Sequence, residues 1–421
     1  MLSTLLSSTC RAGAVISILF TVPVAAATRI ATSATLDATL ASAVGGDKVS
    51  LIGNFGEVRL TNRNYSGVMT IDASQATFTT AMVLDNVWNV AVSGGTFNIG
   101  NNGAYAKGVV VYNGANVYIE GITVNGGGTV DQFGVTFNGT HNAQVTFSKF
   151  NGLYSGIAIG AVAGGFLVKN SFTASTSDGI DIADSHGVTA SRNSCTGATP
   201  RAGAHPDCIQ MWSVAGHALE SDISVTYNTS IGAMQGFSDF DAGQNITISN
   251  NIVSSTYAAG VACYDCINST ITNNSVSTIV GAPYQSQVIV RGGSGNIVTG
   301  NLVAAYNQPR LAGSDPTLDG LTAYQGPAFD DSALALPGIG TGGGAVASAD
   351  ATLLSDEGAI SLDAGAVPEP SSWALLITGF AAVGLARRRA VEHARRRAVE
   401  HARRRAVAHT RRRAVAAGRT A

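Results

Sequence analysis

A repeated pattern of an apolar residue, two variable residues and an asparagine constrains this chain more than any other feature. It occurs six times between Leu167 and Asn301, and its asparagines are Asn170, Asn193, Asn228, Asn251, Asn274 and Asn301. Successive asparagines are 23, 35, 23, 23 and 27 residues apart, and a period of roughly 20 to 30 residues is typical of stacked repeats. The chain is therefore expected to form a solenoid.

Each repeat is predicted to consist of strands. Leu is sparse, whereas Val, Ile, Thr, Ser, Gly and Asn dominate and alternate with a period of two, unlike a leucine-rich repeat. One unit shows short strands at Gly179–Ala183, at Gly187–Ala190 and just after Asn193. Three strands and three turns per coil, with coils about 4.8 Å apart, predict an all-β parallel β-helix solenoid. The repeated asparagine is expected to adopt a left-handed backbone at a turn and to hydrogen-bond to asparagines on adjacent coils.

The first strands of eight coils can be aligned between Gly108 and Arg291. Their second and usually fourth residues are expected to point inward, and their third and fifth outward. The outward face then carries Tyr112, Asn138, Asp181, Gln210, Trp212, Phe240, Tyr264 and Arg291. Asp239 falls at an inward position, which indicates either a bulge or a register wrong by one residue.

The residues before and after the repeats divide the chain further. Residues 1–27 contain an apolar run that ends in three alanines, which predicts a signal peptide and export through the Sec pathway. Leu36 to Val44 is expected to form a short helix that caps the β-helix domain, residues 28–307. Residues 308–366 are rich in Gly, Ala and Ser and predict a linker.

Residues 367–389 combine Pro-Glu-Pro, a Trp, a short apolar segment and an Arg cluster. This order resembles the PEP-CTERM sorting signal of Gram-negative envelope proteins. The resemblance implies a C-terminal hydrophobic anchor helix in the membrane, removal by an exosortase, and a final location at the cell surface, outer envelope or extracellular matrix. The sequence departs from that family in residues 390–421, where an Arg-rich octapeptide recurs and is expected to be attracted to lipid if it is retained.

The charge of the chain is unevenly distributed. Residues 28–386 hold 11 basic and 25 acidic side chains, a formal charge of −14, whereas the tail after Ala386 holds 13 Arg and 2 Glu. An acidic body argues against nucleic acid as a partner. We expect a monomer whose partner is a polysaccharide.

Four cysteines follow the leader: Cys195, Cys208, Cys263 and Cys266. In an exported protein they are expected to form two short-range disulfides. A bridge between Cys195 and Cys208 would hold the base of an insertion. A zinc site and buried unpaired thiols are the alternatives.

The candidate site lies at the one long repeat. The step from Asn193 to Asn228 contains extra chain at residues 196–207 and 214–221, and loops on a rigid scaffold commonly carry function. Asp178 and Asp207 precede strands on adjacent coils, so stacking places them roughly 5 Å apart at the backbone. The pKa of one of two such carboxyls should rise, which suits a general acid beside a general base.

Two motifs extend this prediction. Thr176-Ser177-Asp178-Gly179 and His205-Pro206-Asp207-Cys208 resemble the Asn-Thr-Asp-Gly and Gly-Asp-Asp-Cys motifs of the polygalacturonase family. The resemblance implies a right-handed, pectate-lyase-like β-helix, a pectin-cleaving glycosidase activity, and catalytic roles for Asp178 and Asp207.

The chain also departs from the polygalacturonase pattern. Pro206 replaces one aspartate, and Gln235 falls where the family has the histidine of Gly-His-Gly. Ala262 and Tyr264 fall where the family has an Arg-x-Lys pair. These departures favour a broader class, a carbohydrate-active lyase or glycosidase.

Each candidate residue is given a role in that chemistry. The predicted catalytic residues are Asp178, Asp207, His205 and Asp181, and the predicted substrate-binding residues are Gln210, Trp212, Phe240, Tyr264, Arg201 and Arg291. In a lyase, an Arg would neutralise a uronate carboxylate and His205 or Tyr264 would act as the base. The three aspartates are alternatively expected to hold Ca²⁺.

Structural roles compete with each of these assignments. Aspartates before glycine often serve turns, aromatic residues on a face are often covered by a loop, and a loop histidine is often simply exposed. The competing function is a non-catalytic surface or matrix protein that binds polysaccharide or has a structural role.

Overall fold

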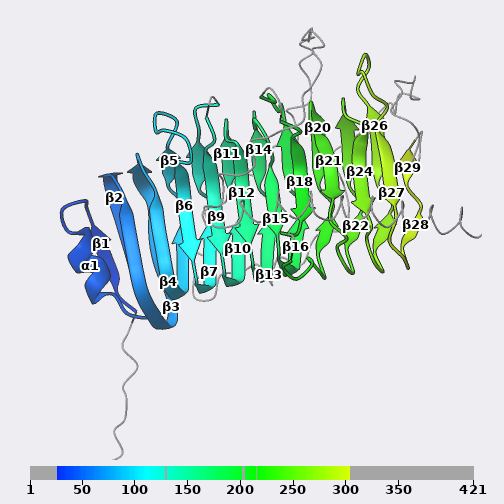
Figure 1. Cartoon of the computed structure of the whole chain (residues 1–421). Coiled ribbons are helices and arrows are strands. Elements are labelled where there is room, and N and C mark those ends of the chain that lie inside the picture. Colours follow the sequence, from blue (N-terminus) through cyan, green and yellow to red (C-terminus); the bar gives the residue numbers. More distant parts are fainter. Residues whose placement is uncertain (1–25, 129, 202–203, 215, 304–421) are drawn as a thin grey trace, which may run out of the picture.

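The computed structural model describes residues 26–128, 130–201, 204–214 and 216–303. Most of the predicted signal peptide, and the predicted linker, sorting segment and Arg-rich tail, lie outside these residues. Within them the chain is an all-β solenoid with one short helix, α1 (Leu36–Ser42), at its N-terminal end (Figure 1).

The first turns of the solenoid contain long strands and the helix. The strands are β1 (Thr28–Ala31), β2 (Lys48–Phe55), β3 (Val58–Phe78) and β4 (Met82–Ser93). The predicted capping helix is confirmed, although it ends two residues earlier than expected. Leu36 and Leu40 lie one turn apart, so both point to the same face and are buried in the core.

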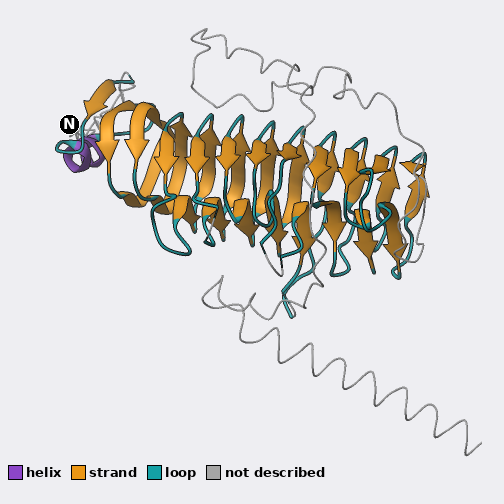
Figure 2. Cartoon of the chain, turned by 90° about the horizontal axis from the view of Figure 1, so that it is seen from above, coloured by secondary structure: helices purple, strands orange, loops and turns teal. Residues whose placement is uncertain are grey.

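Later coils each contribute one strand to each of three parallel stacks, seen from above in Figure 2. The first stack contains β6 (Lys107–Tyr112), β9 (Phe133–Asn138), β12 (Ser155–Gly160), β15 (Ile180–Ala183), β18 (Asp207–Trp212), β21 (Gln235–Asp239), β24 (Ala259–Tyr264) and β27 (Gln287–Arg291). The second contains β7 (Ala115–Glu120), β10 (His141–Thr146), β13 (Ala163–Val168), β16 (His186–Ser191), β19 (Ser224–Thr226), β22 (Thr247–Ser249), β25 (Thr270–Thr272) and β28 (Ile297–Thr299). The third contains β5 (Thr96–Asn98), β8 (Thr123–Asn125), β11 (Lys149–Asn151), β14 (Ser171–Thr173), β17 (Ser194–Thr196), β20 (Thr229–Gly232), β23 (Ile252–Ser255), β26 (Ser275–Thr278) and β29 (Leu302–Val303).

The inward positions predicted for the first stack are confirmed. Residues at the first inward position pair in register from coil to coil and are fully buried; they are Val109, Val135, Ile157, Ile180, Ile209, Phe237, Val261 and Val288. Burial of such side chains is the main favourable contribution to folding. Asp239 also points inward, because β21 pairs with β18 and β24 without a register shift and Asp239 is fully buried. The alternative of a bulge or a misread register is therefore wrong.

The asparagine ladder is confirmed in its hydrogen bonds. Asn193 Nδ2 donates to Asn228 Oδ1 at 3.0 Å and to the carbonyl oxygen of Leu167 at 2.7 Å. The backbone N–H of Asn193 donates to the same Asn228 Oδ1 at 2.9 Å. Equivalent bonds continue through Asn301 and satisfy polar groups that the turn would otherwise bury unpaired.

The expected left-handed conformation of these asparagines is wrong. The positive φ angle occurs one residue earlier, for example 57° at Lys169, 57° at Arg192 and 59° at Tyr227. The ladder asparagine is therefore selected for its amide, which bridges coils, and its neighbour absorbs the bend.

Candidate functional site

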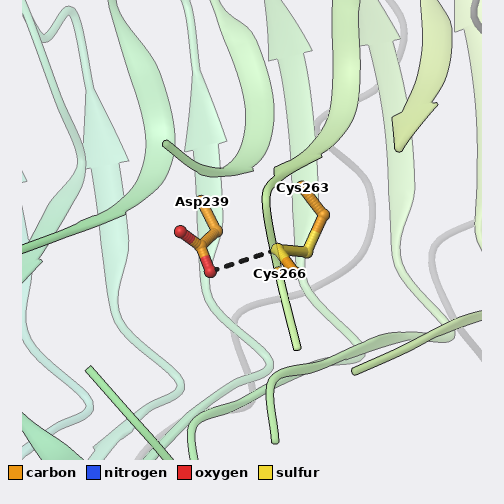
Figure 3. Close-up of side chains that lie close together, drawn as sticks. All are labelled: Asp239, Cys263 and Cys266. Carbon is orange, nitrogen blue, oxygen red and sulfur yellow. Dashed lines mark hydrogen bonds between the residues drawn. A yellow bond between two sulfur atoms is a disulfide. The ribbon is translucent and has the colours of Figure 1, made fainter. Parts of the chain in front are cut away.

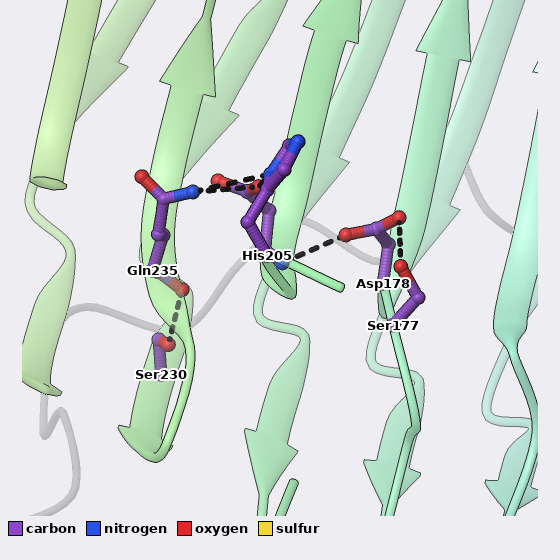
Figure 4. Close-up of polar contacts among 6 residues, drawn as sticks. Ser177, Asp178, His205, Ser230 and Gln235 are labelled. Atoms are coloured by element: carbon purple, nitrogen blue, oxygen red, sulfur yellow. Dashed lines mark hydrogen bonds and ion pairs between the residues drawn. The ribbon is translucent and has the colours of Figure 1, made fainter. Parts of the chain in front are cut away.

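Asp178 and Asp207 lie on adjacent coils and contact each other, as predicted (Figure 4). Asp178 lies two residues before β15, and Asp207 is the first residue of β18. Asp178 Oδ1 accepts the backbone N–H of Asp207 at 2.7 Å, and its Oδ2 accepts the hydroxyl of Ser177 at 2.9 Å. Both aspartates are fully buried, so the contact is shielded from solvent.

Asp181 completes a cluster of three carboxyls. It points outward from β15 and pairs in register with Gln210 of β18, which in turn pairs with Ser238 of β21. Asp181 Oδ1, Asp207 Oδ1 and Gln210 Oε1 are enclosed and accept no hydrogen bond from the described residues. Buried acceptors without donors are destabilising, so this concentration of them sets the site apart from the ordinary coils.

The three carboxyls have raised pKa values. Burial raises the pKa of Asp178 well above its usual range, and the charges of Asp181 and Asp207 raise it further. Burial raises the pKa of Asp181 to about 6, with a further contribution from the charge of Asp207. Burial also raises the pKa of Asp207, although its interaction with His205 opposes this effect. Burial and the neighbouring carboxyl charges therefore favour the protonated form of Asp178.

His205 and Gln235 both contact Asp207, and Figure 4 shows the His205 and Gln235 side chains pointing toward each other. His205 Nδ1 lies 3.4 Å from Asp207 Oδ2, and that interaction raises the pKa of His205. Gln235 Nε2 lies 3.3 Å from both Asp207 Oδ2 and His205 Nδ1. The position that holds a histidine in the polygalacturonase pattern thus holds an amide, whose N–H group donates to the carboxylate.

Arg201 is not placed as expected for a substrate-binding residue. Its guanidinium pairs with Asp131, and its Cζ lies 5.0 Å from the ring centroid of Tyr154. Burial and the nearby charge of Asp178 raise the pKa of the Tyr154 hydroxyl. Arg201 therefore connects the long insertion to an earlier coil beside the carboxyl cluster.

The predicted aromatic row is present in part. The rings of Phe240 and Tyr264 stack at 5.7 Å between centroids, and His205 meets Phe240 edge-on at 6.1 Å. Trp212 is partly buried next to Ala183 in register. Arg291, the last residue of β27, pairs in register with Tyr264 of β24. It lies three coils beyond Asp207, which is about 14 Å along the solenoid. The structure does not bring Arg291 to the carboxyl cluster.

The cysteines form the predicted disulfides, Cys195–Cys208 and Cys263–Cys266. The first joins β17 to β18 and closes the insertion at its base, as expected. Because Cys208 directly follows Asp207, this bridge also fixes the start of β18, where Asp207 lies.

The three aspartates do not form a compact metal-binding group. Among the described residues, the group of acidic, His and Cys side chains whose ligand atoms all lie within 4.8 Å of one another contains Asp239, Cys263 and Cys266 instead. The expected Ca²⁺ site at Asp178, Asp181 and Asp207 is therefore not preformed, since Ca²⁺ takes six to eight oxygen ligands at about 2.3–2.6 Å.

Sequence reasoning missed several residues of the site. Ser177, Tyr154 and Asp131 contact the cluster or its neighbours, yet nothing in their local sequence singles them out. The sequence marks Gln235 only as a departure from the polygalacturonase pattern, whereas in the structure it pairs in register with Asp207 and contacts its carboxylate. Glu220 was missed as a buried acid: burial and the charge of Asp239 raise its pKa to about 9.

The fold is a right-handed parallel β-helix. Residues 107–303 match the family model described as a right handed beta helix region. No curated protein sequence matches the chain significantly. Within the described residues, no helix is both long enough and apolar enough to span a bilayer.

Solved structures of similar shape include enzymes and an adhesin. An alginate lyase from Paenibacillus sp. is 17% identical with a TM-score of 0.42, covering 67% of this chain and 99% of the lyase. An exopolygalacturonase of Yersinia enterocolitica is 10% identical with a TM-score of 0.42, covering 66% of this chain and 77% of the enzyme. A surface adhesin of Streptococcus pneumoniae is 11% identical with a TM-score of 0.41, covering 64% of this chain and 86% of the adhesin.

Proposed function

We propose that this protein is an exported, cell-surface enzyme that cleaves glycosidic bonds of a polysaccharide at the outward face of the first strand stack. The supporting observation is the cluster of Asp178, Asp181 and Asp207, whose carboxyls have raised pKa values beside His205. Groups that hold and release protons near neutral pH are what acid–base cleavage requires. Export and surface location rest on the signal-like leader and the PEP-CTERM-like segment.

The proposed chemistry divides the roles between the two coils. Asp178, whose pKa is raised well above its usual range, donates its proton to the glycosidic oxygen as the C–O bond breaks. Asp207, held by Gln235 and His205, accepts a proton from a water molecule, whose oxygen bonds to the anomeric carbon. Asp181 raises the pKa of Asp178 through its charge and so keeps the acid protonated.

Polysaccharide binding is assigned to the outward side chains next to this cluster. Phe240 and Tyr264 stack on each other and continue the row from His205, and rings of this kind stack on sugars. Gln210 contributes an enclosed carbonyl oxygen beside Asp181, and this oxygen accepts no hydrogen bond from the residues that the structure describes. Sugar hydroxyls are suitable donors for such an acceptor.

The second candidate is a non-catalytic β-helix that binds polysaccharide at the surface or in the matrix. The observation that favours it is the complete burial of Asp178 and Asp207, with Ser177, Gln235 and His205 as partners. Carboxyls enclosed in this way also serve as hydrogen-bond acceptors that fix the start of a strand.

One experiment separates the two candidates. The purified protein is incubated with polyuronates and neutral glycans while the absorbance of unsaturated products and the release of reducing ends are followed. We expect activity that falls at least about a hundredfold in Asp207→Asn, because one acid–base group typically contributes that factor or more. Asp222→Asn, an exposed carboxyl next to the insertion, is the matched control and should be unaffected.

The possible outcomes decide between the proposals. Activity that survives in Asp207→Asn means that the catalytic site lies elsewhere. An absence of product from every glycan, combined with binding measured by affinity electrophoresis, supports the non-catalytic candidate.

A further inference from the structure

The interior of the solenoid contains a second group of polar side chains at the end of β21. Asp239 occupies an inward position between Met211 of β18 and Cys263 of β24. It is fully buried, as are Cys263 and Cys266. The three side chains lie close together (Figure 3). A charged residue at a core position is costly unless it is paired, and Asp239 Oδ1 is paired with one donor, the backbone N–H of Asp241 at 3.1 Å.

The backbone leaves room for the Asp239 carboxyl. A Cβ added at Gly243 would collide with Asp239 Oδ2, so the Asp239 carboxyl fits here because Gly243 has no side chain. Asp239 Oδ2 lies 3.4 Å from Cys266 Sγ. Because Cys266 is disulfide-bonded to Cys263 and carries no S–H hydrogen, this separation is an S···O contact. The ligand atoms of Asp239, Cys263 and Cys266 all lie within 4.8 Å of one another.

Glu220 is a fourth candidate ligand beside these three residues. The residues that follow Glu220, Gly243 and Cys266 are bridged from coil to coil, so these three residues occupy the same position on successive coils. Glu220 is fully buried, and neither of its carboxylate oxygens accepts a hydrogen bond from the described residues. The side chain next to its carboxyl is that of Asp239. Glu220 thus lies beside Asp239, at the edge of the group that Asp239 forms with Cys263 and Cys266.

We propose that, once the Cys263–Cys266 disulfide is reduced, this group binds one Zn²⁺ through Cys263 Sγ, Cys266 Sγ, the Asp239 carboxylate and the Glu220 carboxylate. Zinc prefers four ligands in a tetrahedral arrangement, and two cysteines separated by two residues are a common half of such a site. Carboxylates complete many zinc sites, and Asp239 and Glu220 lie on the two preceding coils.

The redox step balances with a dithiol reductant. The dithiol gives up two electrons and two protons and becomes a disulfide, while the Cys263–Cys266 bridge becomes two thiols. Zinc binding then displaces the protons of both thiols to solvent. The site is independent of the proposed glycan site, because Asp239 points into the core whereas Asp181 points outward.

The test uses the full chain with Co²⁺ as the probe. The protein is reduced with a water-soluble phosphine, which takes an oxygen atom from water and becomes a phosphine oxide. This reductant competes only weakly with the protein for the metal. We expect one equivalent of Co²⁺ to give a thiolate-to-cobalt charge-transfer band that Zn²⁺ abolishes, and no such band in protein that was not reduced. A reduced wild-type protein without the band would overturn the proposal.

Variants locate the metal and identify its ligands. Asp239→Asn and Glu220→Gln each keep every cysteine and should weaken Zn²⁺ binding at least tenfold in competition with a chelating dye. The double variant Cys195→Ser, Cys208→Ser removes the other cysteine pair and should retain the band. Loss of the band in that control, with retention in Cys263→Ala, Cys266→Ala, would assign the metal to the other pair and refute the inference. Circular dichroism of the β-structure confirms that each variant is folded.

Discussion

Replacing Asp181 by asparagine should change how the stability of the protein depends on pH. Asp181 has a pKa of about 6 in the folded protein against an ordinary value of 3.8. Each pKa unit corresponds to about 1.4 kcal/mol of differential interaction, so the difference is worth about 3 kcal/mol. Burial is the larger cause, and the negative charge of Asp207 on the adjacent coil adds to it.

The sign of this effect follows from the direction of the shift. A raised carboxyl pKa means that the folded protein holds its proton more tightly than the unfolded chain does. The contribution of Asp181 to stability is therefore fully present below about pH 4 and is lost as the pH rises through 6. Asparagine does not ionise, so the variant lacks this loss. Burial still raises the pKa values of Asp178 and Asp207 in the variant, although Asp178 loses the part of its shift that the charge of Asp181 causes.

The assay is urea unfolding followed by circular dichroism across this pH range. The free energy of unfolding of Asp181→Asn, relative to wild type, should rise by about 3 kcal/mol between about pH 4 and about pH 7. Asp222→Asn, whose exposed oxygen accepts a hydrogen bond from Asn245, serves as the control and should show no such trend. If the difference between Asp181→Asn and wild type is the same at every pH, burial does not raise the pKa of Asp181, and the reasoning from its burial is refuted.

Two further predictions concern the solenoid itself. Gly236→Ala should destabilise or unfold the protein, because the added Cβ would collide with the carbonyl oxygen of Gly260 on the next coil. In the control Gly103→Ala the added Cβ meets nothing within 4 Å, so that variant should be neutral. Thermal melting of both variants checks this. Asn228→Ala should lower the free energy of unfolding by about 3 kcal/mol or more, because it leaves buried N–H groups of Asn193 without an acceptor, and urea titration measures the loss. A loss below about 1 kcal/mol would mean that the ladder contributes little to stability.

Much of the fold is predictable from the sequence, because a solenoid translates short-range periodicity directly into three-dimensional contacts. Alternation decides which side chains face inward, and the repeat length decides which residues become neighbours on adjacent coils. The same logic predicts that Asp178 lies next to Asp207. Asp178 lies two residues before β15, and Asp207 begins β18, the next strand of the first stack. It also places Asp239 in the core, a result that looked improbable only because the residue is charged.

The backbone conformation at the turns is less predictable. Asparagine tolerates a left-handed backbone, so assigning it to the ladder positions was reasonable from propensity alone. The structure places Lys169, Arg192 and Tyr227 in that conformation instead. The hydrogen bonds explain this, because Asn193 can bridge two coils only if its amide points along the solenoid axis, and the residue before it must then make the bend. Tertiary contacts override the local preference.

Contacts between inserted loops and distant coils lie beyond this kind of prediction. Arg201 and Asp131 are separated by 70 residues and by no fixed number of repeats, so periodicity gives no reason to pair them. Their pairing nevertheless alters the site, because an Arg201 that is engaged with Asp131 and Tyr154 differs chemically from one that is free to bind a uronate. The positions of Asp178 and Asp207 follow from the repeat of the coils. The positive charge that Arg201 can offer to a substrate depends on the contacts of the insertion. A glycan that carries carboxylates must therefore compete with Asp131 for the guanidinium of Arg201, and a neutral glycan need not.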